Sequence, residues 1–152
     1  METVGGADEQ KNSGLAELRR VSRKAHEAVD EAFSRFDLAD PQSYGAFLTA
    51  HARVLVGAEV YLSRHASSVP VWRPRAELLK DDLCQMGLAV PAVQAECLPE
   101  SDGTAMGVLY VLEGSRLGGR VLSGRVGAGL PRAYLSAFHQ KGEWPAVLEQ
   151  LG

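Results

Sequence analysis

Four side chains whose types suit ligand binding recur along one stretch of the sequence: Arg19, Arg23, His26 and Asp30. Their spacing places them on one stripe of a helix, because Cβ atoms three and four residues apart lie above one another. A carboxylate one turn from a histidine can accept the N–H of one ring nitrogen, which leaves the other nitrogen free for a metal. The two arginines suit anionic groups of a ligand. Taken alone, the pattern favours the solvated face of an amphipathic helix, with His26 at its boundary.

A second unusual stretch, residues 103–120, places Gly107, Gly114 and Gly118 on one face of an otherwise apolar helix. Each interior glycine costs about 0.5–1 kcal/mol relative to alanine. The pattern therefore predicts a surface on which Cβ atoms are not tolerated. Either a closely packed neighbouring helix or a flat ligand would require such a surface, and the glycines also permit a kink over a ligand.

The remaining titratable residues carry weaker signals. His51 has an inward position in its predicted helix and is interpreted as a hydrogen-bonded core histidine. Asp81 and Asp82 are expected to be exposed helix charges. The two cysteines, Cys84 and Cys97, are too few for a disulfide scaffold and lack partners for a zinc site. We therefore expect them to pack as small hydrophobic side chains, and their number favours a reducing cytoplasm.

Four principal helices must position these residues, and their ends carry local signals. Asp40 and Pro41 predict the start of the second helix, and Ser101 or Asp102 caps the fourth. Gly87 predicts the end of the third. Apolar spacing predicts helices over residues 15–36, 41–65, 74–86 and 104–121, with short helices at about 132–140 and 145–151.

The chain as a whole predicts one all-α domain. Residues 1–13 have almost no large apolar side chains and are expected to be a disordered leader. The remaining sequence shows no repeat and no alternating strand, which favours a helical bundle. The chain has 152 residues, of which 45% are hydrophobic, a proportion typical of a soluble globular protein with a core. Its net charge of −3 argues against a nucleic-acid binder. No apolar stretch reaches the ~18 residues of a membrane span, and no secretory signal is present.

Two stretches together resemble one family. Residues 18–30 (LRRVSRKAHEAVD) resemble the first helix of biliverdin-producing heme oxygenases, and residues 109–119 (LYVLEGSRLGG) resemble their distal helix. The second match is closest to bacterial members associated with bacteriophytochromes. Residues 44–48 and 78–83 fit the same family, so the resemblance covers about residues 15–140. It implies a heme-oxygenase-like helical bundle over residues 14–152.

The resemblance also assigns residues on the first helix. Heme would lie between the first and fourth helices, with His26 as the proximal ligand of the iron. Asp30 would bind the other ring nitrogen of His26, and Arg19 and Arg23 would bind the propionates.

On the distal helix, the resemblance names Gly114, Ser115 and Gly118 as catalytic. The two glycines would let the helix backbone approach the porphyrin. Ser115 stands where many members carry an aspartate that organises water, and a hydroxyl can also hold a water molecule.

The implied reaction converts heme and O2 to biliverdin, CO and ferrous iron. Electrons would come from a ferredoxin or a flavoprotein reductase, and a bacteriophytochrome would accept the biliverdin. An alternative is a non-catalytic domain that binds heme or another tetrapyrrole, or that regulates a protein partner. The related thiamin-degrading enzymes are disfavoured because no cysteine has the expected acid–base neighbours. Only 33 residues follow Gly119, so we expect looser heme binding than in members with further helices.

Overall fold

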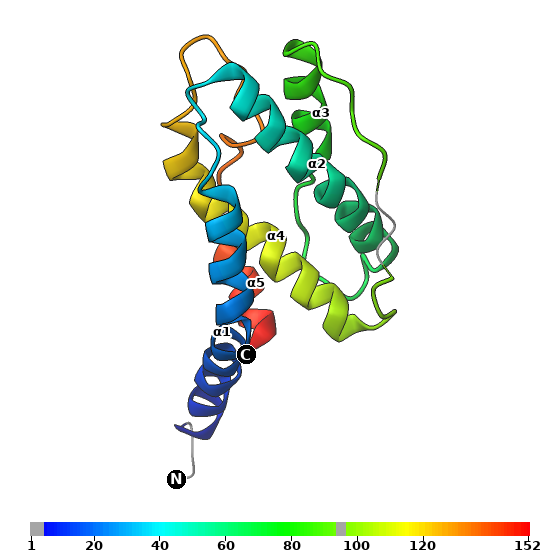
Figure 1. Ribbon diagram of the computed structural model, residues 1–152. Coiled ribbons are helices and arrows are strands. Elements are labelled where there is room, and N and C mark those ends of the chain that lie inside the picture. The colour runs from blue at the N-terminus through cyan, green and yellow to red at the C-terminus, as the bar shows by residue number, and fades with distance from the viewer. Residues whose placement is uncertain (1–4, 94–96) are drawn as a thin grey trace.

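The computed structural model describes residues 5–93 and 97–152, which form an all-α bundle (Figure 1). The described residues contain no strand, so the predicted fold class is confirmed. Their five helices are α1 (Gly5–Phe33), α2 (Pro41–Arg64), α3 (Ala76–Gln85), α4 (Asp102–Ser123) and α5 (Glu143–Leu151).

Helix α1 is longer at its start than the sequence predicts. It begins at Gly5, so residues 5–13 of the expected disordered leader are helical here, while residues 1–4 lie outside the described residues. Extending an existing helix avoids the cost of nucleation, and residues 7–11 (ADEQK) include good helix formers. The N-terminal half of α1 projects beyond the rest of the bundle (Figure 1).

The predicted caps of α2 and α4 are confirmed. Asp40 precedes Pro41 and its carboxylate accepts the N–H of Ser43 at 2.7 Å. Ser101 opens α4, and its hydroxyl oxygen accepts the N–H of Thr104 at 3.1 Å. Each cap satisfies a backbone donor that would otherwise lack a partner at the helix start, which is worth about 1 kcal/mol.

Helix α3 ends at the predicted glycine but starts in an unpredicted way. Gly87 has a φ of +71°, and its N–H donates to the carbonyl of Cys84 at 2.9 Å. At the start of the helix, the N–H groups of Arg75 and Ala76 donate to the carboxylate of Glu59 on α2, at 2.7 and 3.0 Å. Glu59 is buried, so α2 supplies the cap that the sequence around Pro74 lacks.

The segment after α4 corrects two predictions. Residues 133–136 form a turn, so the predicted helix over 132–140 is wrong. Asp82 of α3 is fully buried, so the prediction that it is exposed is also wrong. Its two carboxylate oxygens accept the N–H groups of Ala133 and Tyr134, at 3.2 and 2.9 Å. The two errors have one cause, because the turn presents buried N–H groups that need an acceptor from another element.

Two apolar clusters hold the bundle together. One joins the start of α2 to α3 and the turn, and the other joins the end of α2 to α4 and α5. Helix α2 packs against α3 and α4, whereas α5 packs against both α4 and α1. Helix α5 begins two residues before its predicted start. Helix α4 therefore packs against both α2 and α5, while much of α1 is exposed to solvent.

Candidate functional site

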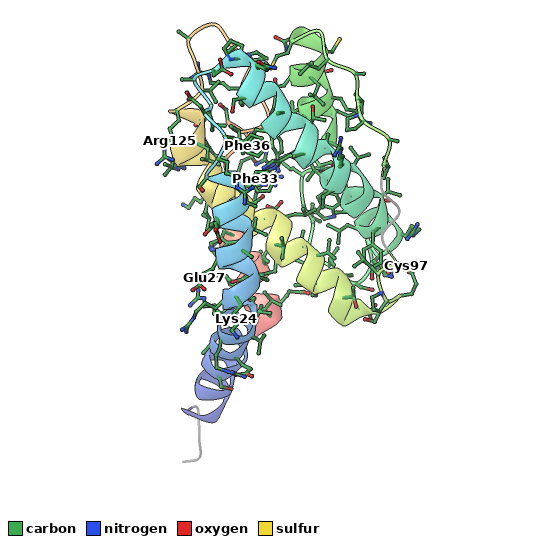
Figure 2. All side chains as sticks on the ribbon, in the orientation of Figure 1. Lys24, Glu27, Phe33, Phe36, Cys97 and Arg125 are labelled. Atoms are coloured by element: carbon green, nitrogen blue, oxygen red, sulfur yellow. The ribbon has the colours of Figure 1, made fainter. Side chains whose placement is uncertain are left out.

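The stripe predicted on α1 is present and open to solvent. Arg19, Arg23, His26 and Asp30 are all exposed helical residues. Within the described part of the chain, none of these four side chains has a hydrogen-bond or ion-pair partner. The structure therefore does not join His26 to Asp30, and both are free to bind a ligand. Figure 2 shows Phe33, the last residue of α1, and Phe36 in the connection to α2, where the chain meets the rest of the bundle.

A cavity of about 580 Å³ lies between the C-terminal ends of α1 and α4. Asp30, one turn after His26, lines it from α1, and Leu122, one turn after Gly118, lines it from α4. Asp30 is the predicted site residue that the lining includes; His26 and Gly118 are outside it, each one helical turn before a lining residue on the same helix face. The other residues that line it are Phe33, Ser34, Phe36, Asp37, Leu38, Phe47 and Arg125.

The surroundings of the α4 glycines show which of them faces a packed neighbour and which is open to a flat ligand. A Cβ built on Gly118 would meet no atom within 4 Å among the described residues, so no neighbouring helix packs there. Val111 and Val121 on the same side of α4 are 63% and 59% exposed. Gly119 differs, because its Cβ would lie 2.6 Å from the carbonyl oxygen of Leu135. Close packing explains Gly119, whereas Gly118 borders an apolar surface that is open to a ligand.

Ser115 is held by an arginine that the sequence analysis did not single out. Its hydroxyl donates to the carbonyl of Leu112 at 2.6 Å and accepts from the guanidinium of Arg75 at 2.7 Å. Arg75 is buried, and its guanidinium also donates to Leu112 O at 2.7 Å and lies 5.0 Å from the centre of the Tyr134 ring. Burial lowers the pKa of Arg75. No periodic pattern marks Arg75, because the partners of its guanidinium are 37 to 59 residues away.

A buried ionic cluster fixes the chain after the turn onto the other side of α4. Glu113 and Arg116 are buried and paired at 2.9 Å. The Arg116 guanidinium also donates to the carbonyl of Ala137 at 2.8 Å. Arg73 binds both carboxylate oxygens of Glu143 at the start of α5, and this lowers the pKa of Glu143 to about 2. These contacts position α5 against α4.

His51 is a core histidine, as predicted. Its Nδ1 lies 2.9 Å from the hydroxyl of Tyr134, and its ring contacts Phe33 and Phe47. Burial lowers the pKa of His51 to about 4, with a smaller contribution from the positive charge of Arg75. The residue is therefore neutral at pH 7 and serves packing in this structure.

The pKa of His51 predicts how stability depends on pH. The pKa is lowered from about 6.5 in the unfolded chain, so the folded state is favoured while His51 is neutral and loses that advantage as pH falls below 6.5. We expect protonation of His51 to lower the free energy of unfolding by about 2 kcal/mol between pH 8 and pH 5. Urea unfolding of wild type and His51→Gln at both pH values measures this change in the free energy of unfolding. An equal loss in the two proteins would contradict the assignment.

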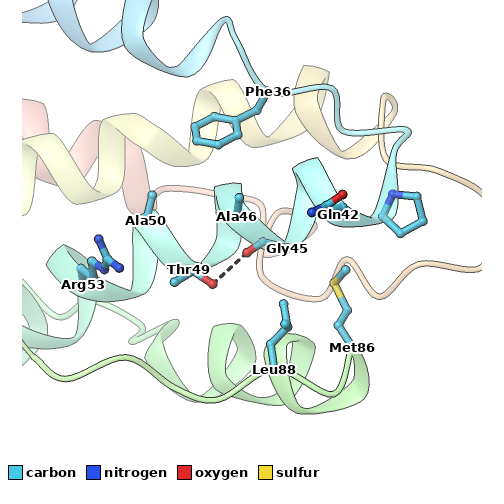
Figure 3. Close-up of a pocket in the computed structure, with 10 residues that line it drawn as sticks. Phe36, Gln42, Gly45, Ala46, Thr49, Ala50, Arg53, Met86 and Leu88 are labelled. Carbon is cyan, nitrogen blue, oxygen red and sulfur yellow. Dashed lines mark hydrogen bonds between the residues drawn. The ribbon is translucent and has the colours of Figure 1, made fainter.

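A second cavity, of about 660 Å³, lies between α2 and the chain that follows α3 (Figure 3). Leu88 packs against α2 at Gly45, where a Cβ would lie 2.7 Å from the leucine Cδ1. Most of the lining is apolar, and its polar members are Gln42, Thr49 and Arg53. It has no histidine, cysteine or carboxylate, so we assign no chemistry to it.

The described residues contain no cluster of three or more histidine, cysteine, aspartate or glutamate side chains that could hold a metal ion. A lone exposed histidine such as His26 suits a metal whose other ligands come from a cofactor. In the same part of the chain, no helix is both long and apolar enough to cross a membrane.

Comparison with known proteins points to the family that the motifs resemble. The chain is 35% identical over 88 residues to a protein named heme oxygenase from Xanthomonas campestris pv. campestris (strain 8004). The match covers 55% of this chain and 53% of that protein, so the chain spans about half the length of the curated relative it matches. No protein-family model matches the chain. No solved structure matches it either.

Proposed function

We propose that this chain is a heme oxygenase that binds heme between α1 and α4 and cleaves it with O2 and external electrons to biliverdin, CO and ferrous iron. The observation that carries the proposal is that one cavity is lined both by Asp30 of the α1 stripe and by Leu122, which lies one turn after Gly118 on α4. Similarity to a heme oxygenase over about half the chain supports the same conclusion. We place the activity in a single domain over residues 14–152.

The exposed residues of α1 and α4 that precede this cavity along each helix fit heme. His26 has an imidazole without a protein partner, as an axial ligand requires. Gly118 offers an open surface where a Cβ would otherwise stand, and the exposed Val111 and Val121 give it an apolar border. A flat apolar macrocycle needs such a surface, and its carboxylate groups need cations.

Each residue has a defined task in the proposed site. His26 would bind the iron, and Asp30, one turn away, would orient the imidazole by accepting its other N–H. Arg19 and Arg23 would bind the propionates from the same stripe of α1. Heme, when bound, supplies the iron and the conjugated ring on which the oxidation takes place.

On the opposite side of the heme, Gly118 would keep the backbone of α4 close to the macrocycle, whereas Gly114 packs against the Trp144 ring, 3.6 Å from its built Cβ. The Ser115 hydroxyl oxygen keeps one acceptor lone pair, because it has two and Arg75 donates to only one of them. Ser115 would therefore accept a hydrogen bond from water in the distal pocket, and Arg75 would hold its hydroxyl in place.

One observation favours the second candidate, a protein that binds heme or another tetrapyrrole without cleaving it. The Ser115 hydroxyl proton is already committed to Leu112 O, so this side chain donates no proton to a ligand. Without a donor at this position, the distal side lacks one group that could deliver protons during cleavage, which favours binding alone.

Titration with hemin, followed by addition of a reductant, tests the proposal and separates it from the alternative. We expect one hemin per chain, a Soret band typical of histidine ligation, and conversion to biliverdin with release of CO. Stable binding without conversion would support the tetrapyrrole-binding alternative, and absence of stoichiometric binding would refute both. A ferredoxin or a flavoprotein reductase is the proposed electron donor, a bacteriophytochrome the proposed acceptor and the cytoplasm the proposed location.

A further inference from the structure

The indole of Trp144, in the first turn of α5, lies in an aromatic stack at the edge of the glycine face. It stacks with Tyr110 of α4 and with His139, and both ring-centre distances are 5.6 Å with interplanar angles of 26°. A Cβ built on Gly114 would lie 3.6 Å from Cη2 of the indole. The benzene edge of Trp144 therefore rests against the backbone of α4 at Gly114.

Several contacts hold this indole in place. Glu143, its neighbour in the chain, is bound by Arg73, and Val147 one turn later is buried in the core beside α4. On the other face of the stack, Nε2 of His139 lies 3.3 Å from a carboxylate oxygen of the buried Glu113 but makes no hydrogen bond. The indole is therefore held mainly through its own helix, by Glu143 and Val147.

The two distal glycines consequently have different neighbours, although they share a helix face. Gly114 accommodates Trp144, whereas the space beside Gly118 is open. They are four residues apart, which is about 6 Å along the helix axis. The benzene edge of Trp144 therefore stands one helical turn from the open surface and borders it on the N-terminal side of α4.

We propose that Trp144 is a binding residue of the tetrapyrrole site, whose indole forms the side wall that confines a flat macrocycle to the Gly118–Leu122 part of α4. This inference rests on the proposed function and deepens it. A fixed aromatic edge contacts a conjugated ring favourably and loses little entropy on binding, because it is already held. Gly114 then serves the packing of the wall, and Gly118 faces the ligand.

The test compares two tryptophans that pack on the same apolar cluster, Trp144 and Trp72. Hemin is titrated into wild type, Trp144→Leu and Trp72→Leu, and affinity and Soret circular dichroism are recorded. We expect Trp144→Leu to bind hemin about tenfold more weakly and to change the Soret ellipticity, because that signal depends on nearby aromatic rings. Trp72→Leu should leave the Soret ellipticity unchanged and alter the affinity by less than about twofold.

A second arm uses Gly114→Ala, whose added Cβ would make only an ordinary contact with the indole. If the macrocycle is confined to the Gly118 side, this variant keeps the wild-type affinity for hemin. A marked loss would mean that the macrocycle covers Gly114 and would overturn the proposal.

Unchanged or tighter binding by Trp144→Leu would also overturn it, and tighter binding would mean that the indole occupies the ligand's space. Far-ultraviolet circular dichroism of the apoproteins checks folding. If Trp144→Leu loses helix, Trp144→Phe decides, because its shorter ring preserves packing but should still weaken binding measurably. Failure of wild type to bind hemin would refute the proposed function itself, and this is distinct from an effect confined to Trp144.

Discussion

Replacing His26 with alanine should remove the histidine-ligated spectrum of the hemin complex and weaken hemin binding by at least about 100-fold. Even residues that only orient a metal ligand are worth about 10–100-fold in affinity, so loss of the ligand itself should cost at least as much. His51 is not a substitute ligand, because it is bonded to Tyr134 in the core. Soret titration and electron paramagnetic resonance of the ferric complex measure the change, and added imidazole should partly restore the spectrum.

His65→Gln is the matched control for this experiment. His65 caps the far end of α2, and its Nε2 lies 3.1 Å from a carboxylate oxygen of Glu100. This variant should retain the spectrum and the affinity of wild type. Because His26 is exposed, His26→Ala should also leave the thermal unfolding of the apoprotein unchanged. A normal spectrum with normal affinity in His26→Ala would exclude this residue as the iron ligand.

Local signals in the sequence predict the helices well. Asp40, Ser101 and Gly87 act within three or four residues of their own positions, and each marks a helix end in the structure. The features that the sequence did not predict, such as the burial of Asp82, depend on interactions between distant segments. Asp82 reads as an exposed helix charge until the turn at Ala133, 51 residues later, supplies its donors.

In the candidate site, too, local spacing could be predicted and long-range contacts could not. Helical spacing was sufficient to place His26 and Asp30 on one stripe and Gly114 and Gly118 on one face. It could not reveal that Trp144 covers Gly114 while Gly118 stays open, since that depends on how α5 packs against α4. Nor could it find Arg75, whose guanidinium reaches Ser115 across 40 residues of sequence.

Replacing Gly118 with leucine should block heme binding without unfolding the protein. The added side chain would enter the open space beside α4, where a built Cβ meets no described atom, so the apoprotein gains no clash. Removing a glycine from the interior of a helix should instead stabilise the apoprotein by up to about 1 kcal/mol. Once a macrocycle lies against this surface, the leucine competes with it. We expect hemin affinity to fall by about 100-fold, equivalent to about 3 kcal/mol.

Gly107→Leu is the control that separates the effect of position along α4 from the effect of the glycine-to-leucine change itself. Gly107 lies on the same face of α4, and its Cβ would also meet no described atom. It is 11 residues before Gly118, about 16 Å along the helix, and Trp144 at Gly114 lies between them. Both variants gain the same helix propensity, so we expect them to stabilise the apoprotein equally. A loss of hemin binding confined to Gly118→Leu would place the macrocycle on the cavity side of Trp144. Unfolding of the Gly118→Leu apoprotein would show that this glycine serves packing, and equal hemin binding by both variants would show that the ligand lies elsewhere.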